Sequence, residues 1–312
     1  MISMRSHIVS LAAIFLALAL GIVLGATKVQ SPILVGKEAD NTQLTQQRDQ
    51  LQQQHDQLAQ QVTNDQRFAG DISALAVRGT LPKATVVLVS TADADPGDKE
   101  ALLGLLARSG ATVSAQIQVT ADFTDPARSA ELQSLLAKSL PAGSTIPEVA
   151  SAGTMAGALL GAVLLTDANG KATAQPEEAT AAMSALSAGG FVTASGAQSP
   201  GRLVLILTGA AITGGSETDR AAMLADLAAQ LKKASGGVLL AGRSGSEAGT
   251  GAVGAVRSDP ARSGAVSTID DVENATGRLG AVLGLVEQSG GGVGQYGGGT
   301  GAQAPIPVLA VG

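Results

Sequence analysis

An uncharged, apolar run near the N-terminus dominates the hydrophobic pattern of this chain. It covers residues 8–26, reads IVSLAAIFLALALGIVLGA, and has Ser10 as its only polar side chain. A helix rises about 1.5 Å per residue, so the run is long enough for the roughly 30 Å hydrocarbon core of a bilayer. No later stretch is both as long and as apolar. The pattern therefore predicts one transmembrane anchor that attaches the protein to a membrane.

Charges on either side of the run predict its orientation. Arg5 precedes it and Lys28 follows it, so the positive-inside rule places the stub, residues 1–7, in the cytoplasm and the body outside. Cleavage as a signal peptide is the alternative, but the run exceeds the usual apolar region of about 7–15 residues, and Leu24 is a poor −3 residue for a cut after Ala26. We expect the protein in the cell membrane or envelope.

Small residues recur every four positions within the apolar run, at Ala13, Ala17, Gly21 and Gly25. This spacing places them on one helix face, where small side chains let two membrane helices approach closely. The simpler interpretation is that Ala and Gly are common in such helices. Ala17, Gly21 and Gly25 are therefore candidate helix-pairing residues.

A heptad pattern follows the membrane segment. We expect Pro32 to interrupt the helix, and residues 38–78, which are rich in Gln, to form a coiled-coil helix. Its polar a positions weaken the seam on one side, so a single helix packed on the body and a disordered tract are the alternatives to a parallel homodimer. The seam residues, leucines at d positions and then one valine, are Leu44, Leu51, Leu58 and Val62.

The periodicity of the hydrophobic residues changes in residues 82–289, where predicted apolar strands alternate with predicted amphipathic helices. Continuous β-branched or aliphatic runs at 84–90 and 202–208 predict strands that are buried on both faces. This alternation implies βαβ units and an α/β fold: a Rossmann-like or flavodoxin-like, mostly parallel, three-layer domain. Residues 290–312 are rich in Gly and Pro and are predicted to be a flexible tail. Further strands are predicted at 111–120, 191–193 and 238–241, and helices at 98–109, 126–140, 154–165, 177–187, 217–234 and 272–288.

Composition excludes several kinds of chemistry. The chain has 312 residues, a net charge of −6 and no Cys, so disulfides, thiolate metal sites and Cys nucleophiles are impossible. The acidic balance argues against nucleic acid as a partner. No His follows His55 and no Ser-x-x-Lys occurs, which removes two common nucleophile arrangements. We therefore expect no enzyme, no catalytic residues and no cofactor.

Two glycine-containing loops follow predicted strands and have features of anion-binding loops. Residues 209–216 have the spacing of a phosphate-binding loop, but Gly215 stands where the lysine belongs, so we expect a turn into a helix. Residues 242–246, GRSGS, can present backbone N–H groups and a guanidinium to an anion, although such loops usually only connect elements.

The densest carboxylate cluster is Asp270, Asp271 and Glu273. These oxygens can bind a hard cation. Thr268 with Asp271, or Asp270 with Glu273, also has capping-box spacing just before the last predicted helix. We favour capping, and treat the three carboxylates as weak metal candidates.

Both ends of the chain resemble a known family. Residues 6–21 (SHIVSLAAIFLALALG), 266–278 (VSTIDDVENATGR) and 294–297 (GQYG) are similar to the actinobacterial MctB/SteB family, the mycobacterial copper transport protein B family. The order of elements agrees over nearly the whole length. The resemblance implies copper efflux or resistance as an envelope channel component. A corynebacterial relative is associated with a cytoplasmic partner, SteA, in cell separation and envelope assembly.

The residues give this implication little chemical support. Cu(I) prefers thiolate, thioether and imidazole ligands, yet the chain offers no Cys, two His and five Met. Met1, Met4 and His7 are the one soft-ligand cluster, and they are more simply a start residue and a membrane flank. The alternative to copper transport is a non-enzymatic dimeric scaffold that acts with a cytoplasmic partner in cell separation and envelope assembly.

Overall fold

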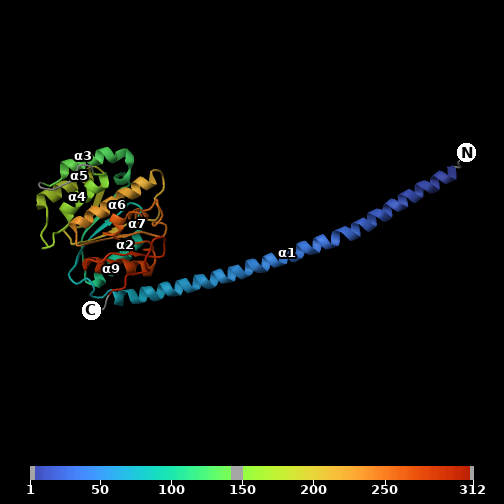
Figure 1. The fold of residues 1–312 in the computed structure, drawn as a ribbon, viewed down its shortest axis with the longest axis horizontal. Coiled ribbons are helices and arrows are strands. Elements are labelled where there is room, and N and C mark those ends of the chain that lie inside the picture. Colours follow the sequence, from blue (N-terminus) through green and yellow to red (C-terminus); the bar gives the residue numbers. More distant parts are fainter. Residues whose placement is uncertain (1–3, 142–149, 310–312) are drawn as a thin grey trace. The chain divides into compact units, whose positions relative to one another are not determined.

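The computed structural model describes residues 4–141 and 150–309 and contains two compact units, Met1–Asn64 and Asp65–Gly312. Helix α1 (Met4–Ala76) forms the described part of the first unit and supplies residues 65–76 to the second (Figure 1). The predicted interruption at Pro32 is wrong, because α1 continues through it. A proline removes one backbone N–H from a helix, and α1 is helical on both sides of this position.

A seven-stranded sheet forms the centre of the second unit, in the order β3-β2-β1-β4-β5-β6-β7. Only β3 runs antiparallel to its neighbour, and the other adjacent strands are parallel. This confirms a mixed α/β fold with a mostly parallel sheet. The strands are β1 (Thr85–Ser90), β2 (Thr112–Val119), β3 (Val192–Ser195), β4 (Leu203–Leu207), β5 (Gly237–Ala241), β6 (Ser267–Ile269) and β7 (Gln295–Tyr296).

Helices cover both faces of this sheet (Figure 1). One hydrophobic cluster packs α2 and α9 on one face, and a second packs α3 to α7 on the other. The helices of this unit are α2 (Pro96–Ser109), α3 (Ser129–Ser139), α4 (Ala152–Leu164), α5 (Pro176–Ala188), α6 (Glu217–Ala234), α7 (Ala252–Arg257), α8 (Pro260–Ser263) and α9 (Ala275–Ser289), with 3₁₀ turns η1 (Ala121–Thr124) and η2 (Pro126–Arg128).

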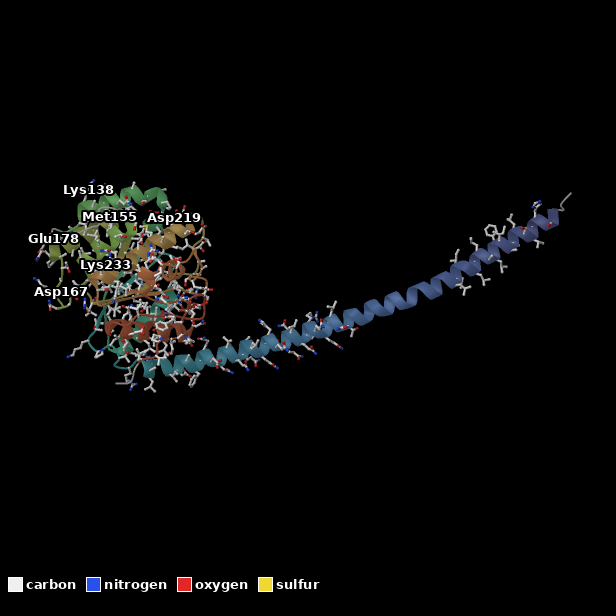
Figure 2. The ribbon with its side chains drawn as sticks, in the orientation of Figure 1. Lys138, Met155, Asp167, Glu178, Asp219 and Lys233 are labelled. Atoms are coloured by element: carbon white, nitrogen blue, oxygen red, sulfur yellow. The ribbon has the colours of Figure 1, made fainter. Side chains whose placement is uncertain are left out.

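Strand alternation explains the two clusters. In β1, Val87 and Val89 contact the α3–α7 side, whereas Val86 and Leu88 contact the α2–α9 side. Successive strand side chains point to opposite faces, so a strand that is covered on both sides must be apolar at every position. Charged side chains lie outside these layers, and Lys138, Asp167, Asp219 and Lys233 are exposed (Figure 2).

Glycines bring helices α4 and α6 into close contact. A Cβ atom at Gly153 would lie 2.2 Å from the carbonyl oxygen of Met223, and one at Gly157 would lie 2.7 Å from the Cβ of Gln230. The apolar stretch at 154–165 is therefore a buried core helix, as predicted, and its glycines are packing positions.

The segment after Gly290 corrects the prediction of a flexible tail. It adds β7 to the sheet edge, where Gln295 and Tyr296 are 5% and 6% exposed. The amide of Gln295 donates to the backbone carbonyls of Ser263 and Val266, and the Tyr296 hydroxyl donates to Glu287. Two strand residues give no periodicity, so the Gly-rich composition concealed this element.

Arg257, at the end of α7, holds this C-terminal segment to the sheet. Its guanidinium donates to the side chains of Asp270 (2.5 Å) and Thr268 (2.9 Å) and to the carbonyls of Tyr296 (2.6 Å) and Thr300 (2.9 Å). The Arg257 and Asp270 side chains are 6% and 2% exposed. Charge-assisted bonds of this kind are stronger than neutral ones, so one buried cation fixes β6, β7 and the loop that follows.

A pair of glycine substitutions tests the α4–α6 packing. Gly153→Ala is expected to lower the free energy of unfolding by about 1–3 kcal/mol, because its methyl group has no room beside the α6 backbone. Gly104→Ala in α2 is the matched control: that position is exposed with no atom near the added carbon. It is expected to raise stability by about 0.5–1 kcal/mol. Chemical denaturation of the full chain measures both, and equal effects would contradict this packing.

Candidate functional site

Polar side chains of the second unit gather at the carboxyl ends of the parallel strands. The chain turns away from the sheet there after β1, β4, β5 and β6, and these turns carry carboxylates, guanidiniums and hydroxyls. In open parallel sheets, ligands bind outside the carboxyl ends of the strands, where the strand order reverses direction. This edge is therefore the candidate functional site.

The reversal lies between β1 and β4. The chain leaves β1 for α2 on one face of the sheet and leaves β4 for α6 on the other face. A cleft of about 380 Å³ opens at this point, above the ends of β1 and β2. We call it the switch-point cleft. Its lining residues are Thr91–Asp93, Val119–Ala121, Thr124, Ala210–Thr213, Arg220 and Leu224.

Two opposite charges line the switch-point cleft without pairing with each other. The Asp93 carboxylate accepts from the Thr91 hydroxyl, and no ion pair is formed by Asp93 in the described residues. Arg220 donates to the Thr124 hydroxyl (3.3 Å) and the Thr213 carbonyl (3.0 Å), and it too lacks a carboxylate partner there. The cleft therefore offers an acceptor and a cationic donor at the same time.

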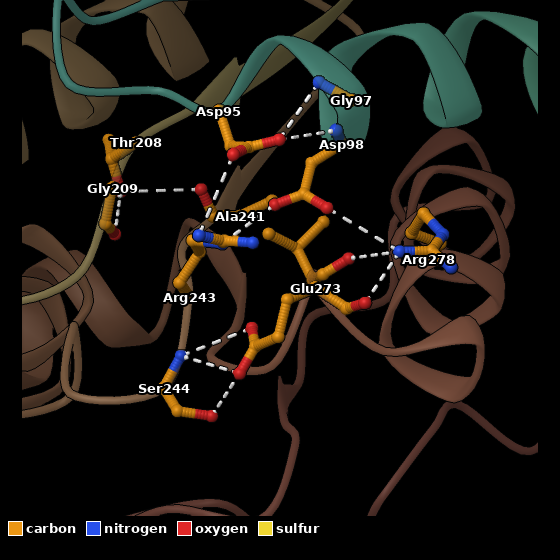
Figure 3. A network of polar contacts seen from close by, with 11 residues as sticks. Asp95, Gly97, Asp98, Thr208, Gly209, Ala241, Arg243, Ser244, Glu273 and Arg278 are labelled. Atoms are coloured by element: carbon orange, nitrogen blue, oxygen red, sulfur yellow. Dashed lines mark hydrogen bonds and ion pairs between the residues drawn. The ribbon is translucent and has the colours of Figure 1, made fainter. Parts of the chain in front are cut away.

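A second polar group, beside the cleft, is closed by its own ion pairs (Figure 3). The buried Asp98 carboxylate lies 2.9 Å from the Arg243 Nε and 3.5 Å from the Arg278 Nη1, and Asp95 lies 3.7 Å from Arg243. Burial raises the pKa of Asp98, while the two guanidiniums oppose this effect. Asp95 also caps α2 through the N–H groups of Gly97 and Asp98. This network joins α2, β5 and α9.

The loop at 242–246 is not available to an external anion. Glu273 accepts from the Ser244 N–H and hydroxyl, and Glu247 accepts from the Gly245 N–H. Arg243, the loop's guanidinium, is paired with Asp95 and Asp98 (Figure 3). The backbone donors that suggested an anion site therefore bind the protein's own carboxylates.

Asp270, Asp271 and Glu273 have three different environments, and the capping interpretation is wrong. Helix α9 begins at Ala275, after this cluster. Asp270 pairs with Arg257 and accepts from the N–H groups of Gly298 and Gly299, while Glu273 binds Ser244. The described residues contain no group of three or more His, Cys, Asp or Glu that could hold a metal ion. The local spacing suggested a helix cap, but the partner of Asp270 is Arg257, at the end of α7.

Asp271 is the carboxylate of this cluster whose ionised form is disfavoured in the folded protein. Its Oδ1 is buried without a hydrogen-bond partner among the described residues. Burial, with the nearby charges of Asp270 and Glu273, raises its pKa from 3.8 to about 6. A carboxylate that is harder to ionise in the folded state lowers stability once the pH is high enough to ionise it.

Helix α1 contains one segment, Ser6–Gly25, that is long and apolar enough to cross a membrane, and the segment is exposed throughout. No atom of the described chain lies within 4 Å of a Cβ built at Gly21 or Gly25, and Ala17 is exposed. The side chains of the flanks, Arg5 and Lys28, lie outside the described residues.

The heptad residues of α1 are also exposed. Leu44, Leu51, Leu58 and Val62 have exposed fractions of 62%, 65%, 60% and 58%. In a single chain these side chains leave an unpartnered apolar stripe, which is the surface that a coiled-coil partner would cover.

The soft metal ligands of the body are methionines. Met155, Met183 and Met223 are half-buried and pack against the core, and Met155 is labelled in Figure 2. The two His, His7 and His55, lie far apart along α1. The predicted cluster of Met1, Met4 and His7 lies partly outside the described residues. No His follows His55, so the body cannot combine thioether with imidazole ligands, two of the kinds that Cu(I) prefers.

Sequence reasoning missed the two charges of the switch-point cleft. The signal for Asp93 was available: TADAD follows the buried strand TVVLVS directly, where the carboxyl end of a parallel strand places polar groups. Arg220 gave no such signal, because it lies within the first turns of a regular amphipathic helix.

Fold and site together define an α/β protein with an N-terminal apolar helix and a polar cleft at the carboxyl edge of its sheet. The family described as "Copper transport outer membrane protein, MctB" matches residues 1–307. Copper transporters MctB of Mycobacterium tuberculosis and Mycobacterium bovis are each 33% identical over 312 residues, covering 97% of this chain and 98% of theirs. That of Mycobacterium leprae is 37% identical over 313 residues, with the same coverage. The chain belongs to the MctB family.

Substitutions of the adjacent residues Asp271 and Asp270 are expected to have opposite effects on the free energy of unfolding. Asp271→Asn is expected to raise the free energy of unfolding at pH 7.5 by about 1–3 kcal/mol, because it removes a charge that burial disfavours. The folded-state pKa is raised, so the penalty is absent below about pH 4, grows as pH rises to about 6, and is complete above it. The increase in the free energy of unfolding caused by Asp271→Asn should therefore be absent below about pH 4, grow as the pH rises to about 6, and stay constant above it.

Asp270→Asn is the matched control, and should lower stability by about 3–5 kcal/mol because it leaves Arg257 buried without its counter-charge. Denaturant titrations of the full chain at pH 4.0, 5.5 and 7.5 measure both variants. A gain for Asp271→Asn that does not change with pH would contradict the buried-carboxylate assignment.

Proposed function

We propose that this protein is a single-pass, membrane-anchored component of the cell envelope that acts in copper transport. Membership of the MctB family carries the proposal, since the relatives that match across the chain are named copper transporters. The exposed apolar segment Ser6–Gly25 supports the anchor. Arg5 before it and Lys28 after it favour a cytoplasmic N-terminus and an extracytoplasmic body.

An envelope channel would require several chains. One helix has no interior that could pass an ion, and a pore needs a ring of polar groups contributed by several elements. Ala17, Gly21 and Gly25 form a face on which helices can approach each other. We therefore propose that copper efflux, and any channel, depend on association of this anchor with other copies or with partner proteins.

A dimeric scaffold is the second candidate, favoured by the exposed heptad residues of α1 and by the lack of Cys and small number of His and Met. In this role the coiled coil pairs two chains, the cytoplasmic stub contacts a cytoplasmic cell-division partner, and the body acts outside. The body would be a Rossmann-like domain, supported by strand order 3-2-1-4-5-6-7 and helices on both faces. No catalytic step is part of either proposal.

Deleting the gene separates the two candidates. If the protein acts in copper transport, the deletion strain should stop growing at lower copper concentrations than the parent and should accumulate more copper per cell. If it acts as a division scaffold, cells should remain joined while copper tolerance is unchanged. Complementation with the full chain should restore the parental phenotype. Unchanged copper tolerance with joined cells would refute copper transport.

Single cysteines test pairing in the native membrane, because the chain contains no other Cys. Leu51→Cys should form an intermolecular disulfide under mild oxidation, since d positions of a parallel dimer face each other at bonding distance. Gln53→Cys, on the opposite side of the heptad, is the matched control and should remain monomeric on non-reducing gels. Equal yields for both positions would rule out the proposed seam.

A further inference from the structure

The switch-point cleft is a pocket for which no ligand has yet been assigned. Five guanidiniums of the body, those of Arg128, Arg243, Arg257, Arg262 and Arg278, each pair with a carboxylate. Arg220 is half-buried in the cleft wall and has no carboxylate partner in the described part of the chain. Its two hydrogen bonds, with Thr124 and Thr213, hold the guanidinium in place. The pKa of Glu217 is lowered first by the Gly215 N–H and also by the charge of Arg220, although Glu217 and Arg220 form no ion pair among the described residues.

Backbone donors lie around the same cleft. Ala210, Ala211 and Thr213 line it, and their N–H groups donate to no other atom of the described chain. These residues belong to the turn that links β4 to α6, and Gly214 and Gly215 follow with φ of 97° and 102°. The Gly215 N–H donates to the Glu217 carboxylate (2.8 Å), so the N–H groups that remain for a ligand are those of Ala210, Ala211 and Thr213.

The opposite charge limits what the cleft can hold. Asp93 sits against Gly209, where an added Cβ would lie 2.5 Å from its Oδ2, so the close approach of the two turns fixes the carboxylate. A simple anion would be repelled by Asp93. An anion that also carries a hydroxyl or ammonium group would meet both charges.

We propose that the switch-point cleft binds a small phosphomonoester that bears a hydroxyl or ammonium group. Arg220 and the N–H groups of Ala210, Ala211 and Thr213 take the phosphate, and Asp93 accepts from the second group. A phosphate has three terminal oxygens for these donors, more than a carboxylate has. The volume of about 380 Å³ suits a ligand of this size. The proposal is independent of copper transport.

Three probes vary the second group while keeping the phosphate. Phosphoethanolamine carries an ammonium, glycerol 3-phosphate carries hydroxyls, and methyl phosphate carries neither. Ligand-observed ³¹P relaxation with the full chain in maltoside micelles measures each dissociation constant. Phosphoethanolamine or glycerol 3-phosphate should bind with a constant on the order of 1 mM or below, at least about fivefold tighter than methyl phosphate. The tighter of the two identifies the second group.

Two variants assign the binding to the cleft. Arg220→Gln should weaken binding of the preferred probe at least about tenfold, because a charge-assisted hydrogen bond is lost. Asp93→Asn should remove the preference over methyl phosphate and strengthen methyl phosphate binding, an effect that simple unfolding cannot produce. Arg202→Gln is the matched control: that guanidinium is half-buried, donates to the Thr166 carbonyl and lies outside the cleft.

Absence of binding up to about 10 mM for all probes would overturn the proposal. An equal loss in Arg220→Gln and Arg202→Gln would do the same, since it would show that general charge or stability controls the binding. Equal affinity for all three probes would refute the role of Asp93 and with it the proposed ligand class.

Discussion

Burial of the central strands on both faces is the constraint on which this fold depends. Parallel strands need crossover helices, and here those helices cover both sides of β1, β4 and β5. Every side chain of TVVLVS, LVLIL and GVLLA must then be accommodated between layers. Charged groups can enter the interior only where strands end, which is why carboxylates and guanidiniums collect at one edge of the sheet.

Small side chains set the distances between these layers. The chain has five aromatic residues and forty glycines, so it fills its core by close approach of backbones more than by large rings. The contact of α4 with α6 through Gly153 and Gly157 is the clearest example. The cleft at the β1–β4 reversal is a consequence of topology, because the turns after these two strands lead to opposite faces of the sheet.

The strongly apolar part of the fold was predictable from sequence. The strand at 202–208 and the helix at 217–234 agree with β4 and α6, because continuous apolar runs and amphipathic periods report burial directly. Strands β6 and β7 escaped prediction because they have three and two residues and depend on Arg257 rather than on their own pattern. Asp270 was misassigned for the same reason: its local spacing matched a helix cap, but its partner comes from α7.

Among site residues, charges close to a strand end could be found from sequence, and their pairing could not. Asp93 and Asp95 stand two residues apart after the same strand, yet Asp95 joins the network of Asp98 and Arg243 while Asp93 remains unpaired among the described residues. The difference comes from the neighbouring turns. The turn after β5 supplies a guanidinium that pairs with Asp95 and Asp98, whereas the turn after β4, TGAAITGGS, contains no charged residue.

The two sides of this sheet edge therefore differ in whether their charged groups form ion pairs. On the β5 side, Arg243 and Arg278 form ion pairs with Asp98, so an incoming ion would have to break existing pairs. On the β4 side, Arg220 and Asp93 are held by hydroxyl and carbonyl contacts and form no ion pair among the described residues. Desolvated pairs resist disruption, while unpaired charges in a cleft attract complementary groups. The proposed ligand site therefore depends on the turns around the β4 end of the sheet and not on the membrane helix.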